Sequence, residues 1–436
     1  MTDVLLIGGG AREHAIAWRL RQSPRLGTLY AAPGNPGIAQ VAETAPLAIP
    51  KPDAPEAQIA GFLDEVAKMA RERRVDLVVV ASDDPLAMGL VDRIEREGIR
   101  AFGPRQAAAR IEWSKAFAKD LMMRHAIPMS TSARFDDFDA ARAYVESRAR
   151  DVVVKADGLA AGKGAIVTSS PAEAVEALRD LMVRGTLGAS GRTVVIEDKL
   201  EGRETSAHAF SDGRTVAHMP FSCDHKPVFD GNRGPNTGGM GVYSPPGWLP
   251  ETTAEQIRRD VTEAAIRAMA AEGVPYRGVL FPGLMITAEG PRVIEFNARF
   301  GDPEAEALLP RLESDLLEIM LACCDGTLDR VDVRWRHEAS VTVMLASGGY
   351  PGAYETGKRI DGLDDVDADV LVFHAGTRRA DDGSIVTAGG RVLGITATGA
   401  TVADARAAAY RNVARISFEG MHYRRDIGAS EVTARV

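Results

Sequence analysis

A short segment before residue 300 constrains this chain most, because it places polar side chains at the end of a buried strand. Residues 293–296 predict that strand, and Glu295 and Asn297 lie two positions apart. On an extended chain, two such side chains point to the same face. Hard oxygen ligands on one face suit Mg²⁺, which takes a few protein oxygens and leaves the others to phosphates. A strand end with a surface salt bridge is the alternative interpretation.

The first hundred residues alternate between strand and helix patterns. We expect strands near residues 4–7, 28–32, 75–82 and 99–102, with helices at residues 11–23, 57–72 and 86–98. This alternation predicts a doubly wound α/β unit, whose ligands bind beyond the carboxyl ends of the strands. Those ends carry Gly8-Gly9-Gly10, Pro33-Gly34-Asn35 and Ser82-Asp83-Asp84.

The glycine turn after the first strand does not predict a dinucleotide site. The GxGxxG pattern would need glycine at position 13, where Glu13 stands, and no acidic residue ends the second strand. A glycine turn before a helix still binds phosphate well. A monophosphate therefore fits better than a pyrophosphate, and a plain tight turn is the alternative.

The middle of the chain contains a second glycine loop. We expect a helix at residues 110–125, a strand at 151–156, a helix at 171–183 and a strand at 193–200. The loop at residues 158–164 resembles a Walker A loop only superficially, since the spacing is one residue short and Gly164 replaces Ser or Thr. It also lies between two predicted strands. We interpret it as a flexible hairpin over phosphates, with a mobile surface hairpin as the alternative.

Residues 221–247 are rich in glycine and polar side chains and predict no regular element. A long loop of this kind is usually functional or disordered, and we favour an ordered substrate loop. A helix at residues 251–273 and a strand at 279–287 follow. From about residue 335 the pattern predicts a mostly β module with one packing helix.

Composition excludes several classes of protein. The net charge is -9 with no sustained basic run, which argues against nucleic acid as a partner. Apolar runs such as residues 77–81 are too short to cross a membrane, and the first residues enter a strand, so we expect no secretory leader. Three cysteines, two of them adjacent, imply no disulfide framework. We expect a protein of the reducing cytoplasm.

Taken together, motifs in order along nearly the whole chain resemble one enzyme family, the phosphoribosylamine–glycine ligases (glycinamide ribonucleotide synthetases). They include GGGAREHA, AAPGNPG, KADGLAAGKG, GPNTGGMGVYSP, VIEFNARFGDPE, SGGYPG and GGRVLGITA. The resemblance implies a multidomain α/β and α+β protein with the ATP-grasp fold. It would comprise a Rossmann-like acceptor-binding domain at residues 1–104, an ATP-grasp nucleotide region at 105–330 and a small β-rich domain at 331–436. A mobile lid subdomain would occupy about residues 126–195.

The resemblance also implies a reaction. ATP, glycine and 5-phosphoribosylamine would give glycinamide ribonucleotide, ADP and phosphate through glycyl phosphate, a step of purine synthesis. Mg²⁺ (or Mn²⁺) would assist, and the enzyme would act as a monomer on small molecules, without nucleic acid or membrane.

Site residues are implied by matching motif positions. Glu295 and Asn297 match the metal ligands, and Lys115 and Lys155 match lysines that reach the nucleotide phosphates. The remaining nucleotide residues would be Gly162, Lys163, Gly164, Glu197, Lys199, Leu200, Glu204 and Leu284. The acceptor and its junction with the nucleotide would contact Gly9, Gly10, Asn35, Asp83, Asp224, Lys226, Asn236, Thr237 and Asp302. Arg299 would hold a carboxylate or its developing charge, and Asp224 or Asp302 could accept the released proton.

Departures from the family pattern cluster at the acceptor side. They are Asp83 for Glu, Trp113 for Gly, Cys223 for Gln, Pro227 for Arg, Ala305-Glu306 for Thr-Gln, and Ala429-Ser430 where the family has Trp-Arg. The nucleotide and metal positions are intact. We therefore keep two hypotheses: a tolerant member with the same substrates, and a paralogue that joins a different amine or amino acid. A nucleotide-binding regulator without turnover is a third, and the intact metal and lysine positions argue against it.

Overall fold

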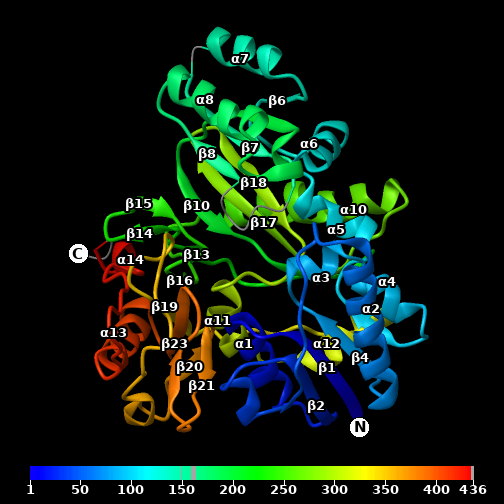
Figure 1. The fold of residues 1–436 in the computed structure, drawn as a ribbon, viewed down its shortest axis with the longest axis vertical. Coiled ribbons are helices and arrows are strands. Elements are labelled where there is room, and N and C mark those ends of the chain that lie inside the picture. The colour runs from blue at the N-terminus through cyan, green and yellow to red at the C-terminus, as the bar shows by residue number, and fades with distance from the viewer. Residues whose placement is uncertain (149, 159–163, 434–436) are drawn as a thin grey trace.

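The computed structural model describes residues 1–148, 150–158 and 164–433. Three lobes surround a common centre: the N-terminal unit and the C-terminal module form the base, and a smaller lobe carrying α7 and α8 stands above them (Figure 1). Among the described residues, no helix combines the length and apolar character needed to cross a membrane.

The N-terminal unit is a parallel five-stranded sheet, as predicted. Its strands are β1 (Thr2–Gly8), β2 (Leu26–Pro33), β3 (Glu43–Thr44), β4 (Leu77–Val80) and β5 (Arg100–Phe102), in the order β3-β2-β1-β4-β5. Its helices are α1 (Ala11–Leu20), α2 (Glu56–Glu72), α3 (Asp83–Ala87) and α4 (Leu90–Glu95). The single helix predicted at residues 86–98 is wrong. Gly89 adopts a left-handed conformation (φ 82°) that separates α3 from α4.

The helix predicted at residues 110–125 is likewise two helices, α5 (Gln106–Trp113) and α6 (Lys115–Arg124). Ser114 between them is extended, and its side chain accepts a hydrogen bond from the Phe117 amide, which is the geometry of an N-cap. Asp157 accepts a further bond from the Ala116 amide at 3.0 Å. The break therefore fixes Lys115 at the start of a helix, next to the segment that leads into the glycine loop.

The upper lobe contains an antiparallel sheet in the order β6-β9-β7-β8. The strands are β6 (Ser132–Phe135), β7 (Val152–Ala156), β8 (Ala165–Val167) and β9 (Val194–Asp198), covered by α7 (Phe138–Ser147) and α8 (Pro171–Leu178). The glycine loop connects the antiparallel pair β7 and β8, so its predicted place between two strands is confirmed. This lobe has a hydrophobic core of its own, which includes Val145, Val154 and Leu178.

A second antiparallel sheet runs below it, in the order β10-β17-β11-β12, with β18 paired to β17. Its strands are β10 (Arg203–Ser206), β11 (Ala209–Asp212), β12 (Val216–His218), β17 (Arg277–Thr287) and β18 (Gly290–Asn297). The helix predicted at residues 251–273 is α9 (Glu251–Ile257), a π turn (Arg258–Glu263) and α10 (Ala264–Ala271).

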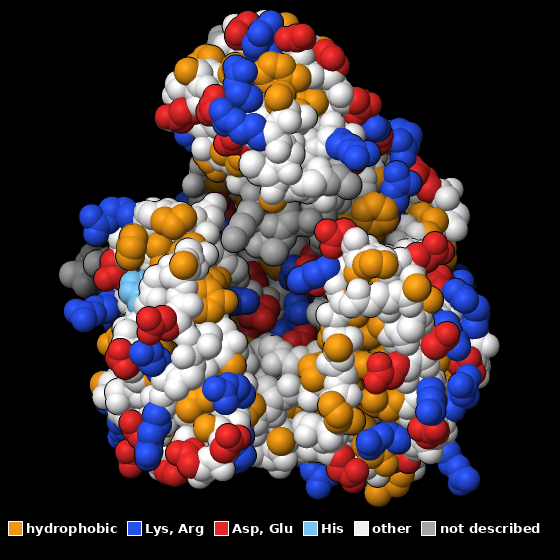
Figure 2. All heavy atoms as spheres, in the orientation of Figure 1, with side chains coloured by type: hydrophobic (Ala, Val, Ile, Leu, Met, Phe, Trp, Pro, Cys, Tyr) orange, Lys and Arg blue, Asp and Glu red, His pale blue; other side chains and the backbone are white. Residues whose placement is uncertain are grey.

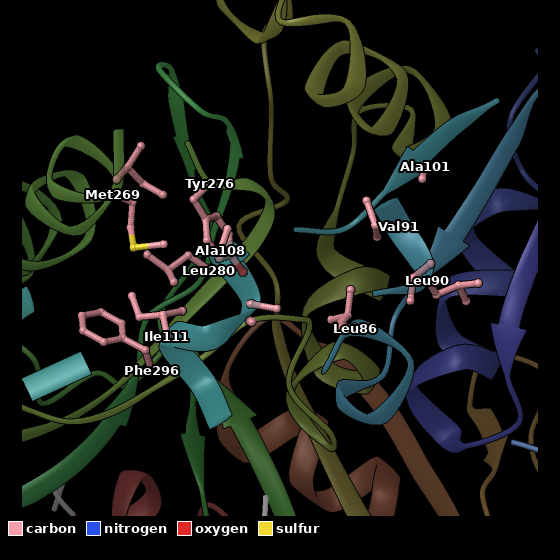
Figure 3. Close-up of a cluster of buried hydrophobic side chains, with 14 of the residues drawn as sticks. Leu86, Leu90, Val91, Ala101, Ala108, Ile111, Met269, Tyr276, Leu280 and Phe296 are labelled. Atoms are coloured by element: carbon pink, nitrogen blue, oxygen red, sulfur yellow. The ribbon is translucent and has the colours of Figure 1, made fainter. Parts of the chain in front are cut away.

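One core joins this sheet to the N-terminal unit. Leu86, Leu90 and Val91 of the N-terminal unit belong to the same buried cluster as Ile111 of α5 and Phe296 of β18 (Figure 3). Helices α11 (Glu304–Leu308) and α12 (Leu316–Asp325) add a second shared core, which packs against β1. The N-terminal unit and the lower sheet thus form one body, whereas the upper lobe has a separate core.

The C-terminal sheet has the order β13-β16-β19-β23-β20. Strands β19 (Ala339–Ala346), β20 (Leu371–His374) and β23 (Arg391–Gly399) come from the C-terminal module, with β21 (Thr377–Arg379), β22 (Ile385–Thr387), α13 (Val402–Val413) and α14 (Ala429–Thr433) around them. Strands β13 (Cys223–Asp224) and β16 (Gly241–Ser244) come from residues 221–247, which we expected to form an ordered loop without regular elements and which also form the β14 (Pro227–Phe229) and β15 (Arg233–Asn236) hairpin. That expectation is wrong: the polar loop is held by a sheet from another part of the chain.

Candidate functional site

A hollow opens between the three lobes, and Figure 2 shows acidic and basic side chains gathered on its floor. The charged residues described below come from all parts of the chain, among them the start of α1, helices α5 and α6, strands β7 and β9, the end of β18 with the turn before α11, the segment around β13, and β23. The predicted site residues therefore converge from most of the chain length.

A buried ion cluster lies at one end. Lys155 of β7 and Lys119 of α6 each lie 2.8 Å from an oxygen of Glu197, and all three side chains are at most 6% exposed. Burial alone would raise the pKa of Glu197, but the two ammonium groups outweigh it and lower the pKa to about 2. Lys155 Nζ also donates to the Ile294 carbonyl at 2.8 Å. Glu197 thus acts as the anchor of Lys155.

The carbonyl that receives Lys155 is free because of a β-bulge. Along the β17–β18 pair, Glu295 lies opposite Gly283 whereas Val293 lies opposite Leu284, so Ile294 is the extra residue. A bulge leaves its extra residue unpaired in the ladder. The predicted strand is therefore confirmed, with a bulge in it that ties β18 to the upper lobe.

The predicted metal pair lies next to this cluster. Lys115 Nζ is 3.0 Å from Glu295 Oε2. The Lys115 charge lowers the pKa of Glu295 further than burial raises it, and Lys226 and Lys155 add to the lowering. Asn297 Oδ1 accepts from Arg299 Nη2 at 3.3 Å. An ionised carboxylate and an amide oxygen two residues apart fit a divalent cation that takes its remaining ligands from phosphates.

The other residues predicted to bind the nucleotide have the following surroundings. Lys199 Nζ lies 3.3 Å from Asp151, Glu204 pairs with Lys226 at 3.4 Å, and Leu284 is fully buried. Leu200, between Lys199 and Glu204 in the chain, is partly buried. The Gly164 carbonyl accepts a bond from the Ala156 amide at 2.8 Å. Gly162 and Lys163 lie outside the described residues.

Arg299 is held by a carboxylate that the sequence did not reveal. Its Nη2 lies 2.9 Å from Oε1 of Glu112, whose other oxygen accepts from the Ala298 amide at 2.7 Å. Burial raises the pKa of Glu112, and the nearby Arg299 charge only partly offsets this. The Nε of Arg299 is buried and has no hydrogen-bond partner among the described residues. Nη1 donates to the Phe300 carbonyl at 3.2 Å, so Nε is the guanidinium nitrogen left without a partner within the described ranges.

Asp83 and Asp302 at the other end share the neighbouring arginines Arg12 and Arg299. Burial would raise the pKa of Asp83, but the Arg299 and Arg12 charges lower it overall. Arg391 Nη2 of β23 lies 2.9 Å from Asp302 Oδ1, in an ion pair that lacks hydrogen-bond geometry. Arg391 Nη1 donates to the Asp302 and Gly238 carbonyls at 2.9 and 2.7 Å. The C-terminal module thereby contributes a cation to the site.

The glycine turn after β1 is closed by its neighbours. Asn35 Nδ2 donates to the Gly9 carbonyl at 2.9 Å and to the His374 carbonyl at 2.7 Å. A side chain on Gly9 would lie 2.5 Å from the Gly34 carbonyl, so only glycine fits there. The Gly10 amide donates to Glu13 at 2.8 Å. Asn35 therefore fixes the turn, and Glu13 takes one amide that a phosphate would otherwise use.

The segment around β13 carries the predicted residues Asp224, Lys226, Asn236 and Thr237. Asp224 Oδ1 is buried and has no hydrogen-bond partner in the described chain. Burial and the nearby Glu304 raise the pKa of Asp224 well above its usual value. Thr237 Oγ1 donates to the Lys226 carbonyl at 2.7 Å, whereas Asn236 is exposed at the end of β15. Thr237 thus supports the segment that carries Lys226.

Sequence reasoning missed four charged residues of this site: Arg12, Glu112, Lys119 and Arg391. Lys119 could have been found, since it lies four residues after Lys115 and so on the same face of α6. Arg12 and Arg391 lie inside motifs that carried the family resemblance, but nothing local distinguishes them from surface arginines. Glu112 gives no signal in its own segment.

Two antiparallel sheets joined at a buried lysine cluster, beside a parallel α/β unit, define an ATP-grasp ligase. Three family models match the chain: the N domain of phosphoribosylglycinamide synthetase at residues 2–112, its ATP-grasp (A) domain at 113–305 and its C domain at 340–430. The chain belongs to the phosphoribosylglycinamide synthetase family, which confirms the predicted fold class and family.

The similarity to relatives extends along nearly the whole chain. The chain is 48% identical over 428 residues to phosphoribosylamine–glycine ligase of Rhizobium meliloti, covering 98% of this chain and 97% of that protein. It resembles the crystal structure of the Thermotoga maritima ligase with a TM-score of 0.84 and 32% identity, covering 98% and 100% of the two chains. The biotin carboxylase domain of Hydrogenobacter thermophilus 2-oxoglutarate carboxylase shares the fold alone, with a TM-score of 0.73 and 15% identity over 96% and 91%.

Proposed function

We infer that the chain joins glycine to 5-phosphoribosylamine with ATP, giving glycinamide ribonucleotide, ADP and phosphate in purine biosynthesis. It is a phosphoribosylamine–glycine ligase by its full-length similarity to enzymes of that name. The observation that carries the chemistry is the buried Lys155–Glu197–Lys119 cluster beside Glu295 and Asn297. That similarity also favours the common substrates over the paralogue hypothesis, although Asp83 and Pro227 depart from the family pattern.

The first step transfers the γ-phosphoryl group of ATP to the glycine carboxylate, because a free carboxylate is a poor electrophile. Lys115 and Lys155 bind the phosphates, and their charge is oriented in advance by Glu295 and Glu197. Glu295 and Asn297 would hold Mg²⁺ (or Mn²⁺), which when bound neutralises phosphate charge and so assists the transfer. Glu204, Lys199, Leu200 and Leu284 are proposed to contact the nucleoside.

Arg299 orients the glycine. Glu112 and Asn297 hold one edge of its guanidinium, so the unpaired Nε can bond to a carboxylate oxygen. The residues at 158–164 would cover the phosphates and exclude water from the acyl phosphate.

In the second step the amine of phosphoribosylamine attacks the acyl carbon. The carbon–nitrogen bond forms, the bond to the phosphate oxygen breaks, and one proton leaves the nitrogen. We assign that proton to Asp224 and not to Asp302, because Asp224 Oδ1 has no hydrogen-bond partner among the described residues, whereas Asp302 Oδ1 lies 2.9 Å from the Arg391 guanidinium. Asp83, Asp302 and the Gly9–Gly10 turn are proposed to bind the acceptor, with Lys226, Thr237 and Asn236 at the junction.

The proposal also includes the predicted domains, localisation and oligomeric state. We retain domain boundaries at residues 104 and 330 and a lid at about 126–195, although β13 and β16 pair with the C-terminal sheet across the second boundary. A cytoplasmic monomer that acts on small molecules, without nucleic acid or membrane, remains our expectation.

Release of ADP tests the function directly. We expect rapid release only when glycine and phosphoribosylamine are both present, and little with either alone. Equal release with a different amine in place of phosphoribosylamine would support the paralogue instead.

An Asp224→Asn variant should lower kcat while leaving ATP binding unchanged. A Glu295→Ala variant that kept both turnover and Mg-ATP binding would remove the metal assignment.

A further inference from the structure

Glu306 in α11 is a buried carboxyl group without a conventional partner. Its side chain is 0% exposed, and neither oxygen receives a hydrogen bond from an N–H or O–H group of the described residues. The side chain within hydrogen-bonding reach is the carboxylate of Asp302, four positions earlier, and the Glu306 amide itself lies near but without hydrogen-bond geometry. A buried carboxylate with no donor is costly, so this arrangement requires an explanation.

Two carboxylates that face one another are both acceptors, and they can bond only if one carries a proton. Arg391 and Arg12 favour the ionised form of Asp302 and lower its pKa, although burial alone would raise it. Burial and the Asp302 charge raise the pKa of Glu306 well above its usual value, and Arg391 opposes this only in part. The proton therefore resides on Glu306.

We propose that Glu306 is a positioning residue: as a neutral acid it donates its proton to Asp302 and fixes that carboxylate at the acceptor end of the site. Asp302 lies over the glycine turn after β1, since a Cβ on Gly10 would be 3.7 Å from Asp302 Oδ2. This proposal rests on the proposed function, because it gives a role to a residue assigned there to the acceptor.

Loss of the proton would place two negative charges side by side in a buried space. Asp302 would then turn away from Glu306, and the acceptor would bind less well at alkaline pH. The charged groups with the largest effect on Glu306 are Asp302 and Arg391 of β23, with Arg12 of α1 acting through Asp302. Helix α1 also carries Glu13, His14 and Arg19, and the turn after α11 (Leu309–Arg311) carries Arg311. The other strands packed on α11, β16 and β19, carry no Asp, Glu, Lys, Arg or His.

Two variants distinguish the effect of the proton that Glu306 donates from the effect of its negative charge. Glu306→Gln keeps a donor to Asp302 and cannot ionise, whereas Glu306→Met fills similar space and cannot donate. We expect the Gln variant to keep KM for phosphoribosylamine within about twofold at neutral pH, and to lose the alkaline rise in KM that the unmodified enzyme shows. The Met variant should raise that KM about tenfold at every pH, while kcat and KM for ATP change little. A Gln variant as impaired as the Met variant would overturn the proposal.

Stability of the ligand-free protein gives a test that does not depend on the substrates. The native state holds a proton that the unfolded chain releases near its ordinary pKa, so stability falls as pH rises towards the native pKa. Between the ordinary and the native pKa of Glu306, the unfolding equilibrium constant of the unmodified protein should rise with pH by up to about tenfold per pH unit, compared with that of Glu306→Gln. Parallel curves from about pH 5 to 9 would show that Glu306 is not held as an acid. Absence of ligation in the ADP assay would contradict the proposed function alone and leave this comparison intact.

Discussion

At the phosphate end of the site lysines outnumber carboxylates, whereas at the acceptor end carboxylates crowd against arginines. Lys115, Lys119 and Lys155 surround Glu197 and Glu295, and both acids have lowered pKa values. At the proposed acceptor end Asp224, Glu304 and Glu306 have raised pKa values, whereas Asp83 and Asp302, which lie near arginines, have lowered ones. The raised values fit the proposed chemistry: ATP brings its own negative charge and needs cations, while amide formation releases a proton and needs groups that can hold one.

We expect the largest effect from removing Lys155, whose side chain contacts Glu197. Lys155→Met should lower kcat by about 100- to 1000-fold, because a preorganised charge on the transferring phosphoryl group is lost. The fold should survive, since Glu197 keeps its contacts with Lys119 and Ser130. Steady-state ADP release measures the effect, and Lys68→Met on the exposed face of α2 provides the matched control. A loss below about fivefold would mean that Lys155 is structural.

Removing the anchor of that lysine should affect stability. Glu197→Gln should cost about 3 kcal/mol at neutral pH, because the carboxylate whose pKa is about 2 has a usual value near 4.5. The contribution is present above the usual pKa and is lost as pH falls through the native one. Urea unfolding should therefore show a gap between variant and unmodified protein that narrows below about pH 4.5. A gap that does not change with pH would contradict the charged cluster.

At the acceptor end we expect a smaller and more selective change. Arg391→Met should raise KM for phosphoribosylamine about tenfold, since Asp302 would lose the cation beside it. KM for ATP should stay within about twofold, because Arg391 lies at the other end of the hollow. Initial rates with each substrate varied in turn separate the two. Equal increases in both constants would mean that the two ends are not independent.

The smallest effect concerns the pair that lies between the ends. Glu204→Gln removes the partner of Lys226, but the side chain of Glu204 is 46% exposed and solvent screens the pair. We expect KM for ATP to rise about two- to threefold, with the unfolding free energy changed by less than about 1 kcal/mol. Isothermal titration with a nonhydrolysable ATP analogue would measure the first, and an unchanged affinity would contradict the proposed contact of Glu204 with the nucleoside.

Local sequence patterns were enough to predict much of the fold. They predicted the strand that carries Glu295 and Asn297, and the strand–loop–strand pattern placed the glycine loop correctly. The metal role of Glu295 and Asn297 stays a prediction. The misplaced helix ends had readable signals, namely Gly89 and the Ser114 N-cap before Lys115. The acceptor end was harder, because its contacts join distant segments: Ala298 bonds to Glu112 across 186 positions and Arg391 to Asp302 across 89.

The protonation of Glu306 could not be predicted from sequence at all. A glutamate within DPEAE is typical of an exposed helix start, and only burial beside Asp302 changes its state. The polar loop at residues 221–247 was misjudged for a related reason, since its strands are completed by partners about a hundred residues further along the chain.

The C-terminal sheet contains strands from two distant parts of the chain, and this matters for any shortened version of the protein. Strand β16 pairs with β19 through four consecutive residues, from Gly241 to Ser244. A version ending before β19 would leave that edge bare, with apolar neighbours such as Val242 uncovered. Unprotected edges template pairing between molecules, so such a fragment should self-associate and precipitate. The C-terminal module therefore also serves as a solubility cap for the segment that carries Asp224 and Lys226.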